Sequence, residues 1–145
     1  MQTKVKDLMK PNPVTISPDS TLREAARHMQ SGGFGVLPVI AEGKDEPEGM
    51  ITDSDIATGA VAEGVDVNTA KVRDYMTPQV FYCNAEDTLE QAAKVMHEHH
   101  VNRLLVKDES GRMCGILSFG CILRKATQMQ EIHQVLECTV GKKAA

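Results

Sequence analysis

The sequence contains no tryptophan, and only 3% of its 145 residues are aromatic. It also lacks a basic surplus, since its formal net charge is −4 at pH 7. Proteins that bind nucleic acid usually present a positively charged face and aromatic rings on which bases stack. We therefore expect no nucleic-acid partner. These observations do not exclude a small ligand that carries phosphate, because such a ligand needs only local positive charge.

Long apolar runs are missing as well. The uncharged apolar runs have the length of strands, whereas a membrane-spanning helix needs about 20 apolar residues. The opening residues, MQTKVKDLMK, carry charges where an export signal has its apolar stretch. We therefore expect a cytoplasmic protein that does not associate with membranes.

Paired cysteines and catalytic motifs are also absent. Cys83, Cys114, Cys121 and Cys138 form no C-x-x-C pair, which favours free thiols in a reducing compartment over a disulfide framework. The sequence contains no P-loop, nucleophile elbow or pair of catalytic carboxylates. We therefore expect a protein without enzymatic activity.

What the sequence does contain is a repeat. Residues 4–29, KVKDLMKPNPVTISPDSTLREAARHM, align with residues 71–96, KVRDYMTPQVFYCNAEDTLEQAAKVM, at an offset of 67 positions. After a gap of one residue, Gly49 aligns with Gly115 and Thr52 with Ser118. Self-similarity over this length indicates two copies of one structural unit.

Each copy is predicted to form a strand, a helix, two strands and a second helix, which gives an α/β protein of two β-α-β-β-α repeats. We expect the first repeat at residues 3–65, the second at 66–126 and a helical tail at 127–145. Neither copy, at about sixty residues, buries its sheet and helices comfortably alone. We expect the copies to pack with pseudo-two-fold symmetry and to leave clefts between them, where small ligands usually bind.

The first helix of each copy has the clearest pattern. Thr21 and Thr88 each stand three residues before Glu or Gln, which is the spacing of a capping box. Short strands are expected just before these helices, at residues 14–16 and 80–82. The apolar residues of the first helix recur at i, i+3, i+4 and i+7, which predicts a buried face of Leu22, Ala25, Ala26 and Met29. The tail has apolar residues at helical spacing, expected to pack on this chain or on a partner subunit: Ile132, Val135 and Leu136.

These phrases resemble the CBS domain (cystathionine-β-synthase domain), and the double unit resembles the tandem pair called a Bateman module. The resemblance rests on DLMKPNPVTISPDSTLREAARHM, GVLPVI and GMITDSDIA with their counterparts in the second copy, and it covers residues 3–126. The segment ATGAVAEGVDVNTAKVRDYM is further similar to small stand-alone bacterial CBS-pair proteins. The resemblance implies a homodimer that binds an adenosyl ligand (AMP, ADP, ATP, S-adenosylmethionine or a dinucleotide) and regulates another protein.

The resemblance also implies which residues form the site. In CBS domains the phrase glycine–apolar–x–Ser/Thr–x–x–Asp supplies it, which here is the phrase that holds Thr52, Ser54 and Asp55. The carboxylate of Asp55 would accept hydrogen bonds from the ribose hydroxyls, and Thr52 would donate to a phosphate. The adenine slot would correspond to Thr15, Ile16, Val36 and Pro38. The resemblance implies no further cofactor.

Physical chemistry gives Thr52 and Asp55 two possible roles. One carboxylate can accept both hydroxyls of a vicinal diol through charge-assisted hydrogen bonds, and a helix N-terminus attracts phosphate. The same spacing is also that of an ordinary helix cap, in which the threonine caps and the aspartate returns the bond. Both roles stay open, and the same two residues can fill both.

The second copy departs from the pattern. It keeps the hydroxyl as Ser118 but has Cys121 in place of the aspartate, and Leu105 where the first copy has proline. The second copy therefore has no carboxylate at this position to accept hydrogen bonds from a ribose diol. Arg103 can hold a phosphate by a bidentate contact, or can be an ordinary surface arginine at the start of a strand. We therefore expect one competent cleft, around Asp55, and one weakened or empty cleft around Ser118.

The run HEHH, at residues 97–100, opens a metal alternative. His97 and His100 stand three residues apart and can share a helix face, with His133 or Cys138 as a further ligand. The other interpretation is the polar C-terminal end of a helix. Three hypotheses follow: a non-enzymatic adenosyl sensor acting in trans on an unidentified protein, an interaction or dimerisation scaffold with no physiological nucleotide, and a metal-binding protein.

Overall fold

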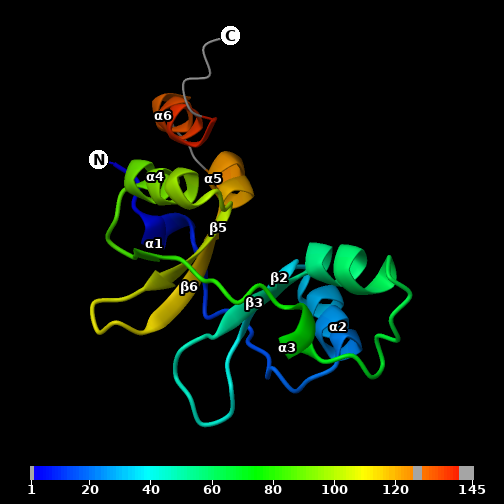
Figure 1. Cartoon of the computed structure of the whole chain (residues 1–145). Coiled ribbons are helices and arrows are strands. Elements are labelled where there is room, and N and C mark those ends of the chain that lie inside the picture. The colour runs from blue at the N-terminus through cyan, green and yellow to red at the C-terminus, as the bar shows by residue number, and fades with distance from the viewer. Residues whose placement is uncertain (1, 126–128, 141–145) are drawn as a thin grey trace. The chain divides into compact units, whose positions relative to one another are not determined.

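The computed structural model describes residues 2–125 and 129–140, which form two compact units (Figure 1). The first unit comprises residues 13–80, and the second unit comprises the described residues before 13 and after 80. Each unit combines paired strands with helices, so the predicted α/β class with a repeated unit is confirmed. No helix within these described residues is long and apolar enough to cross a bilayer.

The first unit is built around an antiparallel hairpin of β2 (Val36–Val39) and β3 (Gly49–Thr52). Single bridges extend the hairpin on both sides, since Ile16 pairs in parallel with Val39 and Thr77 pairs antiparallel with Met50. The helices are α2 (Leu22–Gly32), the π-helix η1 (Asp55–Val61) and α3 (Val72–Tyr75). Apolar side chains from these helices and both strands form one core.

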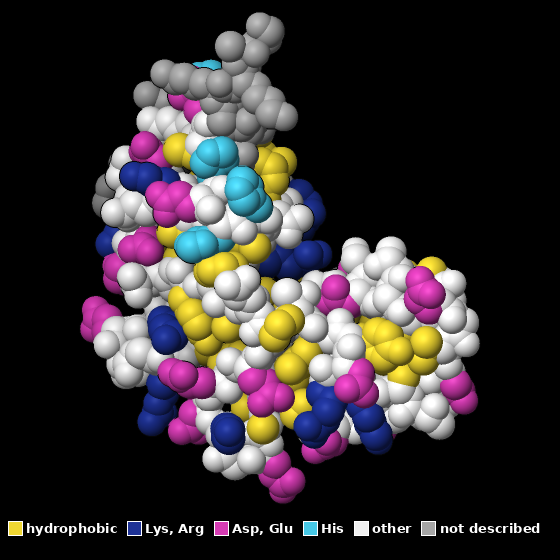
Figure 2. All heavy atoms as spheres, viewed as in Figure 1, with side chains coloured by type: hydrophobic (Ala, Val, Ile, Leu, Met, Phe, Trp, Pro, Cys, Tyr) yellow, Lys and Arg dark blue, Asp and Glu magenta, His cyan; other side chains and the backbone are white. Residues whose placement is uncertain are grey.

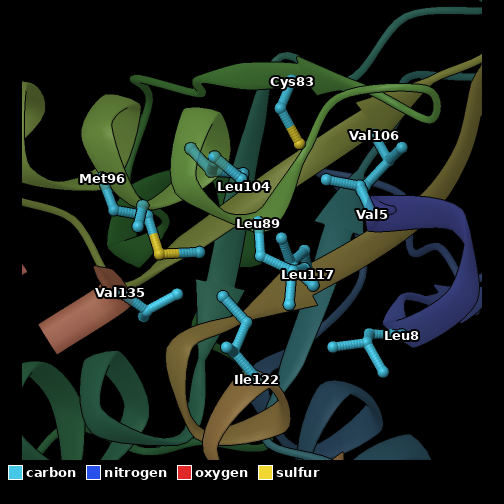
Figure 3. Close-up of a cluster of buried hydrophobic side chains, with 12 residues drawn as sticks. Val5, Leu8, Cys83, Leu89, Met96, Leu104, Val106, Leu117, Ile122 and Val135 are labelled. Carbon is cyan, nitrogen blue, oxygen red and sulfur yellow. The ribbon is translucent and has the colours of Figure 1, made fainter. Parts of the chain in front are cut away.

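The second unit repeats this arrangement with longer strands. Its sheet has the order β1-β6-β5-β4, with β1 at Lys10–Pro11, β4 at Tyr82–Asn84, β5 at Arg103–Lys107 and β6 at Met113–Ser118. Its helices are α1 (Val5–Leu8), α4 (Leu89–His99), α5 (Phe119–Lys125) and α6 (Met129–Val140). Figure 3 shows the core that these elements share, with Val5, Leu104, Leu117 and Val135 among its members.

The two repeats exchange their opening segments. Residues 4–11 belong to the first repeat by sequence, yet they complete the sheet of the second unit through β1, which pairs with β6. Residues 71–77 belong to the second repeat and lie in the first unit. Equivalent hydrogen bonds hold both segments, since Val5 N–H donates to the Asp87 carbonyl oxygen and Val72 N–H to that of Ser20, each at 2.9 Å. Each unit is therefore complete only with residues of the other repeat.

Ion pairs at equivalent positions fasten the exchanged segments. The ammonium groups of Lys4 and Lys6 each lie 2.6 Å from a carboxylate oxygen of Glu86. Arg73 pairs with Asp19 at the corresponding place in the first unit. All these groups are well exposed, so each pair contributes little to stability by itself and mainly fixes the register of the segment.

A glycine in each unit lets the exchanged segment lie against the sheet. A Cβ at Gly49 would be 2.6 Å from the carbonyl oxygen of Thr77 and 2.9 Å from the sulfur of Met76. A Cβ at Gly115 would be 2.5 Å from the sulfur of Met9. The glycine that opens the phrase GMITDSD in the first copy, and its counterpart in the second, are therefore required by packing.

Helix α6 makes the two units different. It packs along α4, and Val135 lies buried in the core of the second unit. Ala93 on α4 is buried in that core, whereas its counterpart Ala26 on α2 is exposed, so the predicted burial of Ala26 is wrong. The reason is that the first unit has no counterpart of α6. Leu136 is 37% exposed, and the side chain of Ile132 lies outside the described residues.

Three local expectations also need refinement. Of the strand predicted at residues 14–16, only Ile16 pairs with a neighbour, while Val14 and Thr15 are exposed. The strand predicted at residues 80–82 is displaced to β4, because alternation of apolar residues defines the faces of a strand better than its ends. The second helix of the first repeat is π-helical: the Ala62 N–H donates to the carbonyl oxygen of Ala57, five residues earlier, at 3.0 Å.

The close approach at Gly49 gives a first prediction. Gly49→Ala should lower the free energy of unfolding by about 1–3 kcal/mol, because the added Cβ overlaps a backbone carbonyl that cannot move freely. Gly59→Ala is the matched control, since its Cβ would meet only the Tyr75 ring, at an ordinary 3.4 Å. Urea denaturation measures both changes. Equal effects of the two substitutions would show that the exchanged segment does not require glycine.

The ion pairs of Glu86 give a pH prediction. Two hydrogen bonds, the larger effect from Lys4 and the smaller from Lys6, lower the pKa of Glu86 to about 2. A lowered pKa stabilises the fold above the unfolded-state pKa, and this stabilisation is lost as the pH falls through the folded-state pKa. Glu86→Gln should therefore lower the free energy of unfolding near neutral pH, and its difference from the wild type should vanish between about pH 4.5 and pH 2. A stability difference between Glu86→Gln and the wild type that does not change with pH would contradict this assignment to the Glu86 ion pairs. The same pH dependence for Glu98→Gln, at an exposed glutamate, would contradict it too.

Candidate functional site

The candidate site of the first unit lies where β3 ends and η1 begins. The Thr52 hydroxyl oxygen accepts a hydrogen bond from the Asp55 N–H at 3.1 Å, and Asp55 Oδ2 accepts one from the Thr52 N–H at 3.0 Å. These reciprocal bonds are a capping box. The cap that the spacing allowed is therefore present in the structure, and it fixes the orientation of the Asp55 carboxylate.

Only one oxygen of this carboxylate is used. Oδ2 also accepts a hydrogen bond from the hydroxyl of Thr77, at 3.4 Å. Within residues 13–80, all of which the structure describes, no group donates to Oδ1 of Asp55. The side chains of Thr52 and Asp55 are half-buried. The cap thus leaves a half-buried, oriented carboxylate with a free acceptor oxygen.

Strand register sets which predicted residues share a face with Thr52. Val36 stands directly opposite Thr52, and Pro38 stands opposite Met50, so these side chains lie on one face of the hairpin. The core residues Leu37 and Ile51 point to the other face. The predicted slot residues Val36 and Pro38 are therefore on the same side of the sheet as the threonine hydroxyl.

The remaining predicted residues have different surroundings. Thr15 is exposed, and Ser54 is exposed at the start of the helical turn. The side chain of Ile16 lies in the core, and its N–H and C=O pair with Pro38 and Ile40. Ile16 therefore holds the strand beside the site and presents no side chain to a ligand on the face of Val36.

Two further residues adjoin the site that the sequence patterns did not single out. Thr77 reaches Asp55 only because the opening segment of the second repeat lies in the first unit. Asp53, next to Thr52 in the sequence, donates its N–H to the carbonyl oxygen of Gly35, and its carboxylate lies where a Cβ of Gly35 would be. The only sequence signal for Asp53 was its position between Thr52 and Asp55. No local pattern predicts the exchange of segments that brings Thr77 to Asp55.

The equivalent place in the second unit keeps half of this arrangement. The Ser118 hydroxyl accepts a hydrogen bond from the Cys121 N–H at 3.0 Å, but no bond returns from residue 121 to residue 118 among the described residues. Instead the Cys121 thiol donates to the carbonyl oxygen of Leu8, at 3.0 Å. Arg103 stands opposite Ser118 in the register of β5 and β6. This place offers a hydroxyl and a guanidinium but no carboxylate.

The cysteines are all free. Burial raises the pKa of the Cys83 thiol to about 12, and burial also raises the pKa values of Cys114 and Cys138. Protonated thiols are poor nucleophiles and poor metal ligands. These three residues therefore have the properties of structural cysteines.

The histidines do not assemble a metal site within the described residues. His97, His99 and His100 are exposed, and Figure 2 shows histidine side chains gathered on one face of the molecule. The rings of His97 and His100 lie 6.4 Å apart between centroids, and His133 pairs with Glu137 at 3.2 Å. Among the described residues no three histidine, cysteine, aspartate or glutamate side chains come together. Structural zinc takes four such ligands, so the arrangement does not fit it.

A chain that builds one α/β unit twice, and completes each copy with the opening segment of the other, is a tandem-repeat module. The CBS domain family model matches both copies, at residues 5–61 and 72–127, so the chain belongs to the CBS-domain family. Its two domains form the pair known as a Bateman module, as the sequence resemblance predicted.

Comparisons with individual proteins agree. The CBS domain-containing protein YhcV of Bacillus subtilis is 35% identical over 118 residues, which cover 81% of each chain. The crystal structure of Hypoxic Response Protein I with two coordinated zinc ions is similar at a TM-score of 0.69, with 31% identity over 85% of this chain and 98% of that one. The structure of CBSX2 in complex with AMP has a TM-score of 0.66 and 26% identity, over 88% of this chain and 98% of that one.

The cap itself can be tested apart from any ligand. Thr52→Val keeps the shape of the side chain but removes the oxygen that accepts from the Asp55 N–H, so it should lower the free energy of unfolding by about 1 kcal/mol. Thr52→Ser keeps that oxygen and should lose much less. Urea denaturation of both variants measures the difference. Equal losses would mean that the hydroxyl does not cap η1.

Proposed function

We propose that this CBS pair is a non-enzymatic sensor that binds an adenosyl ligand through its first unit and acts in trans on another protein. The observation that carries the proposal is the Asp55 carboxylate, which is oriented by hydrogen bonds to Oδ2 and accepts none at Oδ1 from the described residues of its own unit. A ribose diol needs an acceptor of this kind, fixed in direction and partly shielded from water.

The neighbouring groups suit the rest of such a ligand. The Thr52 oxygen accepts from the Asp55 N–H, so the hydroxyl proton stays available for donation to a ligand oxygen. Val36, which is half-buried on the same face, offers apolar surface for an adenine ring, and Pro38 is buried behind it. In this assignment Thr52 and Asp55 cap the helix and bind the ligand at once, because the two roles use different atoms.

The second unit takes a lesser part in this proposal. Cys121 removes the carboxylate, and its thiol is committed to the Leu8 carbonyl oxygen. Ser118 and Arg103 can still contact a phosphate, since they stand opposite each other on paired strands. We therefore assign the diol to the first unit and, at most, an anionic group to the second.

The relatives support the ligand class in different ways. CBSX2 has been crystallised with AMP, which makes an adenine nucleotide a reasonable candidate here. Hypoxic Response Protein I holds two zinc ions, but the described histidines of this chain do not form a comparable set of ligands. We keep the adenosyl ligand as the primary assignment. We further propose that the protein is cytoplasmic and forms a homodimer. Leu123 of α5 and Leu136 of α6, which are exposed, are candidate dimer contacts.

A second candidate function is an interaction scaffold without a physiological nucleotide. The complete capping box favours it, because helix capping alone explains why Thr52 and Asp55 stand three residues apart. The two candidates differ in what the free oxygen of Asp55 does.

A thermal-shift screen with AMP, ADP, ATP, NAD and S-adenosylmethionine separates them. A ligand at a hundredfold its dissociation constant adds about 2.7 kcal/mol to the stability of the protein. For a chain of this size we expect a rise in Tm of several degrees. Asp55→Asn keeps an oxygen to accept from the Thr52 N–H but loses the charge, so it should keep most of the stability and lose the shift. If no ligand shifts the wild-type transition, the scaffold function is the better assignment.

A further inference from the structure

The side chain of Thr77 lies on the ligand face of the first unit. The Met50 N–H donates to the Thr77 carbonyl oxygen at 2.9 Å, and the Thr77 N–H donates to the Met50 carbonyl oxygen at 2.8 Å. Residues bridged in this way stand directly opposite each other, and their side chains point to the same face. Met50 lies two residues before Thr52 on β3, so these two share a face. Thr77 therefore lies on the face of Val36 and Thr52, where the ligand is proposed to bind.

Two donors from separate segments meet one oxygen of Asp55. The Thr52 N–H of β3 donates to Oδ2 at 3.0 Å, and the Thr77 hydroxyl donates to the same oxygen at 3.4 Å. The terminal torsion of an aspartate side chain has broad minima, so one hydrogen bond leaves the plane of the carboxylate a wide range of rotation. The second donor narrows that range. The direction of Oδ1 therefore depends on Thr77.

The position of the exchanged segment does not depend on this hydroxyl. The Arg73 N–H donates to the Pro18 carbonyl oxygen at 3.0 Å, and the Arg73 side chain pairs with Asp19. Helix α3, in the same segment, also packs against η1. Removal of the Thr77 hydroxyl should therefore leave the segment in place and change only the support of the Asp55 carboxylate.

The second unit lacks both members of this contact. Lys10 is aligned with Thr77 in the repeat, and it pairs with β6 as Thr77 pairs with β3. Cys121 takes the place of Asp55. The threonine thus occurs in the copy that has the carboxylate and is absent from the copy that lacks it. This difference is the one expected if the threonine serves to orient the carboxylate.

We infer that Thr77 is a positioning residue of the adenosyl site, whose hydroxyl fixes the Asp55 carboxylate so that Oδ1 meets the ribose diol. This inference rests on the proposed function, since it presupposes that Asp55 binds the diol. Because Thr77 belongs to the second repeat, the first unit binds the diol fully only while the exchanged segment lies against β3. By thermodynamic linkage, a bound ligand then strengthens the attachment of that segment.

Calorimetric titration of the full chain with adenosine and 2′,3′-dideoxyadenosine tests the role of the hydroxyl. The ratio of the two dissociation constants reports on the diol alone, because both nucleosides bind the same folded state and a general loss of stability affects them equally. Thr77→Val keeps the shape of the side chain and removes the donor, so it should reduce the wild-type preference for adenosine about threefold. Thr77→Ser restores the donor and should keep the wild-type preference.

Thr69→Val is the matched control. The Thr69 hydroxyl is also exposed, but it donates to the backbone carbonyl oxygen of Asp66 at 3.3 Å, in the turn before α3, so its loss should leave the ratio unchanged. A wild-type preference for adenosine that persists in full in Thr77→Val would overturn the inference and leave the proposed function standing. So would equal losses in Thr77→Val and Thr77→Ser, or in Thr77→Val and Thr69→Val. Equal affinities of the wild type for the two nucleosides, or no binding of either, would overturn both.

Discussion

The structure depends on the close approach of an exchanged backbone segment to a glycine. In the first unit the segment ending at Thr77 lies against Gly49, and in the second unit the segment around Met9 lies against Gly115. This contact completes each sheet with residues of the other repeat, and it brings the hydroxyl of Thr77 to Asp55. Neither repeat by itself therefore contains all the residues of one unit.

The two strand–helix junctions differ because the first copy has Asp55 where the second has Cys121. The first closes a full capping box between Thr52 and Asp55, and the second keeps only the bond from the Cys121 N–H to Ser118. A cap requires one carboxylate oxygen, which leaves the other for a ligand. Both helices therefore keep a capped N-terminus although the two copies differ in chemistry, since Ser118 alone still caps α5.

Much of this fold was predictable because the sequence is written twice. The repeat predicted one structural unit built twice, and the capping boxes at Thr21 and Thr88 located both first helices, as the structure confirms. Burial of Ala26 was mispredicted, since helical periodicity cannot show whether another helix covers a face. The exchange of opening segments, and with it the contact of Thr77 with Asp55, joins residues far apart in sequence and has no local pattern. The site residues stay a prediction, for which the structure adds the orientation of one carboxylate.

The central claim is that the free oxygen of Asp55 accepts hydrogen bonds from a ribose diol. The most direct measurement compares the calorimetric affinities of adenosine and 2′,3′-dideoxyadenosine, which differ only in those hydroxyls, for the wild type and for Asp55→Asn. We predict that the wild type binds adenosine about tenfold more tightly or better, because the dideoxy compound leaves a partly buried carboxylate unpaired. The preference should disappear in Asp55→Asn. Equal affinities of the wild type for the two nucleosides would contradict the claim and leave Asp55 as a helix cap.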